Sequence, residues 1–233
     1  SNIRGAFTVL DIITKQKKRM LQISTDEVFG SLSSNTATEE SKLNPSSPYA
    51  ATKAVAELLI NSYRVTYDSD VIITRCTNNY GPRQCSEKLI PKTIILAKQG
   101  QNIPSYGNGK NIRDWIHVDD HCNGILSLLL DGKSGQSYNI SGHNEINNIT
   151  IVKKILDIMG KSVDLIEYVE DRPGHDFRYS MSSNKISKEL GWKPKISFEE
   201  GIEKTVEWYL HHEELWKDIS PKILDSTPWK NQL

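Results

Sequence analysis

The sequence at residues 48–76, PYAATKAVAELLINSYRVTYDSDVIITRC, joins a long helix to a β-branched strand. Pro48 suits the first turn of a helix, and the apolar residues after it recur at helical spacing, which predicts a helix over 48–67. Residues 70–76 read as a strand, and so does the short apolar run at 20–24. A strand, a helix and a second strand in this order form the unit from which parallel sheets are built.

The sequence pattern divides the chain into three regions. Residues 1–82 are predicted to form part of a doubly wound, Rossmann-like parallel α/β sheet. Residues 83–219 are expected to form a smaller C-terminal α+β lobe with some segments returning to the sheet, and residues 220–233 a surface tail. Thr150 and Ser197 are expected to cap helices of this lobe. The glycine-rich turn G-x-x-G-x-x-G of dinucleotide-binding sheets does not occur, so we expect the sheet to be N-terminally incomplete.

Composition excludes several classes of protein. Lysine and arginine balance aspartate and glutamate at 29 each, so no overall charge points to nucleic acid or to an anionic membrane. Apolar runs are too short to cross a bilayer, and no leader segment opens the sequence. Cys76, Cys85 and Cys122 form no Cys-x-x-Cys pair, which is typical of a cytoplasmic protein.

Tyr49 and Lys53 are one helical turn apart, and this pair has two interpretations. A helix contains many such pairs by chance. In the functional interpretation, the lysine cation stabilises tyrosinate and lowers the phenol pKa from about 10 towards a range where the oxygen can act as a base.

Thr25, Asp26 and Glu27 follow the predicted strand at 20–24 directly. They are compatible with an ordinary polar turn. Two adjacent carboxyl groups in a partly desolvated site should, however, titrate apart, so that one retains a proton as general acid while the other acts as base. This division of roles suits an elimination.

Seven motifs carry a specific resemblance that extends from residue 1 to about residue 210. In chain order they are STDEVFG (24–30), PYAATK (48–53), TNNYGP (77–82), EKLIP (87–91), YGNGKNIRDW (106–115), YNISGHNEINN (138–148) and DRPGHD (171–176). Together they resemble the nucleotide-sugar 4,6-dehydratases of the extended short-chain dehydrogenase/reductase family. The sequence departs from the family pattern at Phe29, where tyrosine is common, and at Cys85-Ser86, where Phe-Pro is common.

The resemblance implies a hydro-lyase that uses tightly held NAD and converts dTDP-glucose to dTDP-4-keto-6-deoxyglucose. Tyr49, helped by Lys53, would take the proton of the sugar 4-hydroxyl, whose oxygen Thr25 would contact. Glu27 would remove the C5 proton and Asp26 would protonate the departing 6-hydroxyl, after which hydride returns to C6.

The resemblance also implies binding residues. The cofactor would be contacted by Tyr49, Lys53 and Asn79. The substrate would be contacted by Asn78, Lys88, Leu89, Pro104, Ser105, Tyr106, Arg113, Asn148, Arg172 and His175. Each has a plain alternative: a turn for the asparagines, solvated surface for the lysine and tyrosine, and salt bridges with Asp114 or Asp171 for the arginines.

Helices at about 2–15 and 48–66 resemble the family's dimer-forming pair, so we expect a homodimer. No metal is expected, because His117 and His121 lack an evident third ligand. The alternatives are another nucleotide-sugar epimerase or decarboxylase of the same fold, which would not need Asp26, and a non-catalytic protein that binds sugar nucleotides.

Overall fold

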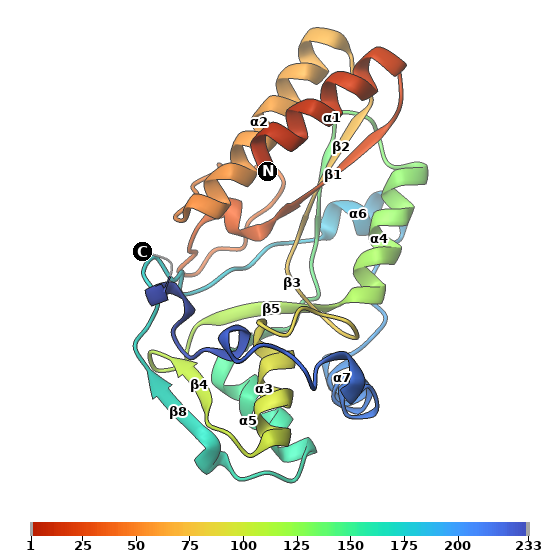
Figure 1. Cartoon of the computed structure of the whole chain (residues 1–233). Coiled ribbons are helices and arrows are strands. Elements are labelled where there is room, and N and C mark those ends of the chain that lie inside the picture. Colours follow the sequence, from red (N-terminus) through yellow and green to blue (C-terminus); the bar gives the residue numbers. More distant parts are fainter. Residues whose placement is uncertain (1, 232–233) are drawn as a thin grey trace.

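A three-stranded parallel sheet forms the centre of the first lobe in the computed structural model, which describes residues 2–231. Its strands lie in the order β1 (Met20–Thr25), β2 (Val71–Cys76) and β6 (Ser137–Ile140). Helices α1 (Asn2–Gln16) and α2 (Pro48–Tyr67) lie side by side along one face, and α4 (Val118–Asp131) and α6 (Asn184–Leu190) cover the other (Figure 1). The predicted doubly wound α/β fold is confirmed.

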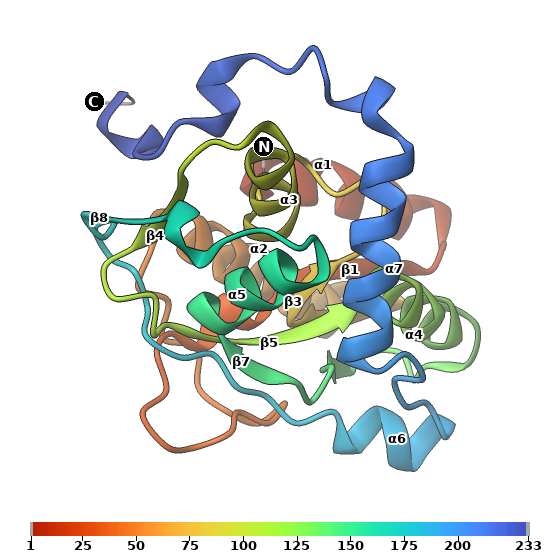
Figure 2. The ribbon, with the colours of Figure 1, turned by 90° about the horizontal axis from the view of Figure 1, so that it is seen from below.

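The second lobe combines short strands with three packed helices. Strand β5 (Ile112–His117) pairs in parallel with β3 (Asn78–Tyr80) and in antiparallel with β7 (Glu145–Asn147). A separate parallel pair joins β4 (Ile103–Tyr106) to β8 (Ile166–Val169). The helices are α3 (Leu89–Gln99), α5 (Asn148–Ile158) and α7 (Phe198–His211) (Figure 2). Their apolar side chains pack in one buried cluster.

The chain passes between the two lobes more than once. Strand β6 and helices α4 and α6 come from beyond residue 82 yet lie in the first lobe. Short 3-10 helices complete the structure: η1 (Asp26–Phe29), η2 (Val163–Leu165), η3 (Glu213–Leu215), η4 (Pro221–Leu224) and η5 (Pro228–Asn231). No helix within the described residues is both long and apolar enough to cross a membrane.

Side-chain caps explain where several helices begin. Ser197 accepts a hydrogen bond from the backbone of Glu200 and caps α7, as predicted. The predicted cap at Thr150 is wrong. Asn147 caps α5 instead, because its side-chain oxygen accepts the backbone N–H of Thr150 at 2.9 Å, so the helix begins earlier than the sequence pattern suggests.

A buried ion pair joins α2 to the central strand. The Arg75 guanidinium donates to both carboxylate oxygens of Glu57 at 2.7–3.1 Å, and both side chains are almost fully buried. The same guanidinium lies 4.9 Å from the ring centroid of Phe29 in η1. The pair therefore fixes α2 and η1 against one strand.

Replacing Glu57 by glutamine should lower the free energy of unfolding by about 3–5 kcal/mol, because the Arg75 charge would remain buried without its counter-ion. Urea denaturation followed by circular dichroism measures this loss. The double replacement Glu57→Met with Arg75→Met should recover much of it. Glu200→Gln, which breaks the exposed pair with Lys204, is the control and should leave the midpoint nearly unchanged. Equal effects of Glu57→Gln and Glu200→Gln would contradict the assignment.

Candidate active site

The site begins where strand β1 ends. Thr25 is its last residue, and its hydroxyl accepts the backbone N–H of Glu27 at 3.3 Å, which starts the tight η1 turn. Gly30 ends that turn at φ +70°, and a Cβ there would lie 2.3 Å from the Asn44 carbonyl oxygen, so only glycine fits. These local constraints place Asp26 and Glu27 at the carboxyl edge of the sheet.

Burial sets the titration of both carboxyl groups. Asp26 is 4% exposed, and desolvation, followed by the charge of Glu27, raises its pKa to about 7. Arg113 and the Thr25 hydroxyl oppose this rise. Burial also raises the pKa of Glu27, against the charges of Arg172 and Arg113. Asp26 Oδ2 has no hydrogen-bond partner among the described residues, which leaves it available for proton transfer.

Tyr49 lies opposite these carboxyl groups in the first turn of α2. It lines a pocket together with Glu27, Lys88, Arg172 and Tyr179. Desolvation and then the negative charge of Glu27 raise its pKa. The expectation that Lys53 lowers the Tyr49 pKa is therefore wrong for this structure, in which the lysine ammonium donates to the Ile23 carbonyl at 2.8 Å.

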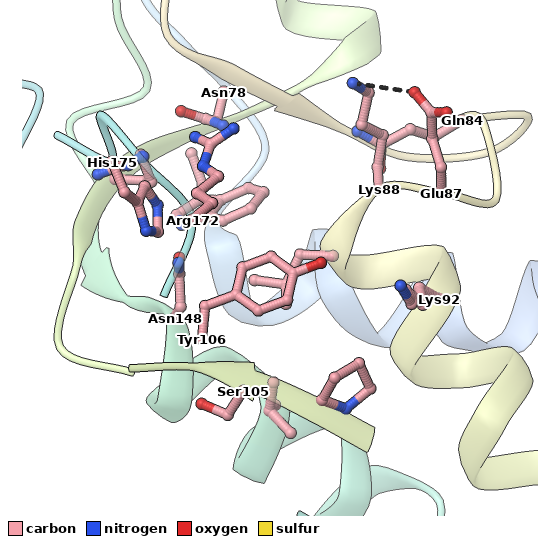
Figure 3. Close-up of a pocket in the computed structure, with 15 residues that line it drawn as sticks. Asn78, Gln84, Glu87, Lys88, Lys92, Ser105, Tyr106, Asn148, Arg172 and His175 are labelled. Carbon is pink, nitrogen blue, oxygen red and sulfur yellow. Dashed lines mark ion pairs between the residues drawn. The ribbon is translucent and has the colours of Figure 1, made fainter. Parts of the chain in front are cut away.

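A second pocket of similar volume, about 840 Å³ and open to solvent, shares lining residues with this one. Figure 3 shows Arg172 and His175 on one side of it, Lys88 and Glu87 on the other, and Tyr106 between them. The structure brings together in its lining all ten residues expected to contact the substrate: Asn78, Lys88, Leu89, Pro104, Ser105, Tyr106, Arg113, Asn148, Arg172 and His175. Lys88 and Arg172 line both pockets, so the two form one continuous site.

Five further lining residues were missed by the sequence reasoning: Gln84, Glu87, Lys92, Trp115 and Val152. Three of them carried a usable signal. Lys92 is one helical turn after Lys88, Val152 is one helical turn after Asn148, and Trp115 is two residues after Arg113 on strand β5, so each shares a face with a predicted residue. The other two offered no such signal.

Arg113 and Arg172 form no salt bridge with any residue in the range 2–231. Arg113 is buried and donates to the carbonyls of Ile112 and Asp176 at 2.7 and 2.9 Å, and the Tyr179 ring lies 4.3 Å away. Asp114 and Asp171, the alternative partners, have other contacts: Asp114 accepts from the Ser141 hydroxyl, and Asp171 contacts His175. Both cations are therefore available to an anionic ligand.

Asp176 is the last residue of the DRPGHD motif, and the sequence analysis assigned it no role. Its carboxylate accepts the Tyr179 hydroxyl at 2.7 Å and also the hydroxyl of Ser46, one residue before the cap of α2. It therefore connects the segment that carries Tyr49 with the aromatic ring beside Arg113.

The two histidines considered as metal ligands lie at the start of α4. His117 accepts the backbone N–H of Asp119 and caps α4, while burial lowers the pKa of His121 to about 4. Within the part of the chain that the structure describes, no three histidine, cysteine, aspartate or glutamate side chains converge as a metal site.

Comparison with known proteins decides the family. A family model described as GDP-mannose 4,6 dehydratase matches residues 1–205. The chain belongs to this nucleotide-sugar dehydratase family. The resemblance inferred from the seven motifs is thereby confirmed.

Individual relatives of the dehydratase family support the same conclusion. A dTDP-glucose 4,6-dehydratase from Streptomyces griseus is 44% identical over 95% of this chain and 68% of its own length. The crystal structure of one from Bacillus anthracis in complex with NAD has a TM-score of 0.91 at 45% identity, over 94% of this chain and 70% of that one. One from Streptomyces venezuelae, also with NAD bound, has a TM-score of 0.92 at 43% identity, over 94% and 68%. The chain spans about two thirds of the length of these dehydratases.

The Asp26 pKa can be tested through stability. The carboxyl group has a pKa of about 7 in the folded state and about 3.8 as the ordinary value, so the folded state binds more protons between these limits. The parent protein should therefore lose about 2–3 kcal/mol of unfolding free energy between pH 5 and pH 8 relative to Asp26→Asn. Urea titrations of both proteins at the two pH values measure the difference. Identical pH dependence would contradict the raised pKa.

Proposed function

We propose that the protein catalyses the NAD-dependent dehydration of dTDP-glucose to dTDP-4-keto-6-deoxyglucose, and that it does so in the cytoplasm. The observation that carries the proposal is the pairing of buried Asp26, with its pKa of about 7, and Glu27 beside a two-part pocket lined by cations. A carboxylic acid that keeps its proton near neutral pH can act as general acid, which an elimination of water requires. The dehydratases with NAD bound described above support the same assignment.

The residues at the carboxyl edge of the sheet suit the nicotinamide end of NAD. Asn79 Oδ1 is buried without a partner in the described residues, so it can accept a hydrogen bond from an amide. The Asn79 Nδ2 atom is used internally and donates to the Thr77 carbonyl at 3.2 Å. Tyr49 and Lys53 would contact the same end of the cofactor. When bound, NAD supplies a hydride acceptor for C4 and a hydride donor for C6.

Each site residue has a step in the proposed reaction. Tyr49 takes the proton of the 4-hydroxyl, while the Thr25 hydroxyl contacts the C4 oxygen. Lys53, whose ammonium donates to the Ile23 carbonyl, would contact the cofactor rather than Tyr49. The 4-ketone makes the C5 proton acidic, and Glu27 removes it. Asp26, protonated through its raised pKa, gives its proton to the 6-hydroxyl so that it leaves as water. Base and acid then act on neighbouring carbons of one sugar.

The second pocket, which contains Tyr106, would hold the nucleotide. Arg113 and Arg172 would bind the diphosphate, because a guanidinium offers paired donors to phosphate oxygens. Lys88 and Leu89 would contact the substrate where α3 begins, and Asn78, Asn148 and His175 would complete the polar contacts. Pro104, Ser105 and Tyr106 would form the platform for the pyrimidine base. In this proposal residues 1–82 belong to the cofactor domain and residues 83–219 mainly to the substrate lobe.

An epimerase or decarboxylase of the same fold would explain less of the site. A 4-epimerase expels no water and has no use for a protonated carboxyl group beside the base. A non-catalytic binding protein would leave unexplained why Glu27 and Tyr49 line one pocket while the neighbouring carboxyl group of Asp26 is buried beside Glu27.

Mass spectrometry of the sugar nucleotide tests the proposal. Incubation of the whole protein with NAD and dTDP-glucose should give a product lighter by one water. Glu27→Gln should slow this loss by about 10²–10⁴-fold, because the amide cannot take the C5 proton. Glu40→Gln, an exposed carboxylate outside both pockets, is the matched control and should retain parental activity. An unchanged product mass, with NAD shown to be bound, would refute the dTDP-glucose assignment.

We also propose that the protein is a homodimer formed through α1 and α2. These neighbouring helices expose apolar side chains in quantity, among them Phe7, Leu58 and Val65 at 47%, 60% and 75%. Exposed apolar side chains on two neighbouring helices are typical of an interface.

Sedimentation velocity at micromolar concentration should show a dimer, and Leu58→Glu should shift it to monomer because a charge would be buried in the apolar interface. Val163→Glu, at an exposed apolar residue of η2, is the matched control and should remain dimeric. A monomeric parent protein would contradict the proposal.

A further inference from the structure

The C-terminal segment, residues 221–231, does not extend into solvent as a free tail. After α7 it crosses above α3 and ends beside the β4–β8 pair (Figures 1 and 2). Leu224 packs against two of the buried apolar clusters, including the one formed by α3, α5 and α7. The segment therefore lies on the surface of the second lobe and packs against it.

The first polar contact of residues 221–231 is with a residue that lines the second pocket. Lys92 lines that pocket and is only 6% exposed. Its ammonium donates to the backbone carbonyl of Asp225 at 2.5 Å. A buried ammonium needs such a partner, so the segment determines where this charge lies.

A second contact reaches the proposed base platform. The rings of Trp229 and Tyr106 are nearly perpendicular, at 87°, with centroids 4.9 Å apart. His175 also lies edge-to-face with Tyr106, at 6.4 Å and 75°. Lys230 forms an ion pair with Glu170 at 2.6 Å, immediately before the DRPGHD motif. Three contacts from one short segment thus converge around the nucleotide end of the site.

We infer that residues 221–231 support the lining of the nucleotide pocket from behind, through Lys92 and Tyr106, and that Trp229 is a positioning residue that orients Tyr106 for stacking on a pyrimidine nucleoside diphosphate. This inference rests on the proposed function, because it assigns the base platform to Tyr106. A stacking ring gains most when its orientation is fixed before the ligand arrives. The edge-on contacts of Trp229 and His175 provide that orientation.

Isothermal titration of dTDP into the whole protein and into Trp229→Ala tests the inference. The variant should bind dTDP about three- to tenfold more weakly, because this factor corresponds to the usual interaction free energy of an aromatic pair. With dTDP-glucose, KM should rise by a similar factor while kcat stays within about twofold of the parent, because the segment contacts only the nucleotide end. Trp229→Phe, which keeps a ring, should recover most of the affinity.

Two further variants separate positioning from folding. Tyr168→Ala removes an exposed aromatic side chain from β8, which pairs with the strand carrying Tyr106, and should leave dTDP affinity unchanged. Trp229→Leu keeps apolar bulk without a ring and should weaken binding as Trp229→Ala does, even where the alanine variant folds poorly.

The outcomes distinguish this inference from the proposed function. Parental dTDP affinity in a folded Trp229→Ala or Trp229→Leu variant would overturn the inference and leave the proposed reaction intact. A parent protein that binds dTDP more tightly than these variants, but removes no water from dTDP-glucose, would overturn only the reaction. A parent protein that does not bind dTDP would overturn both.

Discussion

The buried ion pair between Glu57 and Arg75 is the interaction on which the site depends. Arg75 belongs to the central strand of the parallel sheet, Glu57 to the helix that carries Tyr49, and the Phe29 ring beneath the guanidinium to the turn that carries Asp26 and Glu27. One desolvated pair thus positions the proposed base of the first step relative to the carboxyl groups of the second. Because both charges are removed from water, neither partner can be lost cheaply. Phe29, where the family resemblance led us to expect tyrosine, provides this ring contact.

The Asp26 carboxyl group and the arginine guanidinium groups serve different purposes in the two parts of the site. Around Asp26, burial outweighs the neighbouring cations, so the carboxyl group keeps its proton near neutral pH. In the second pocket, the guanidinium groups of Arg113 and Arg172 form no salt bridge within the described residues and stay available to phosphate. Lys88 and Arg172 line both parts, which suits a substrate whose diphosphate joins a sugar to a nucleoside.

Sequence reasoning succeeded where the signal was local or was carried by several motifs together. The helix at 48–67, the strand after it and the ten pocket-lining residues all depended on such signals. It failed where a distant neighbour decides the outcome. The Tyr49 pKa depends on burial and on Glu27, and the path of residues 221–231 depends on Lys92 and Tyr106. The cap of α5 was missed because asparagine, serine and threonine are all good caps, and only the backbone geometry selects Asn147.

By itself, the sequence determined the α/β class, the family and the residue types available for proton transfer and phosphate binding, because hydrophobic period and motif spacing are properties of the chain. The tertiary structure alone decided which groups meet: that Asp26 is desolvated, that Arg113 donates to backbone carbonyls, that Asp176 connects two distant segments, and that Trp229 lies against Tyr106. The physical reason is that pKa, desolvation and ring packing depend on distances between residues far apart in the chain, and those distances exist only after folding.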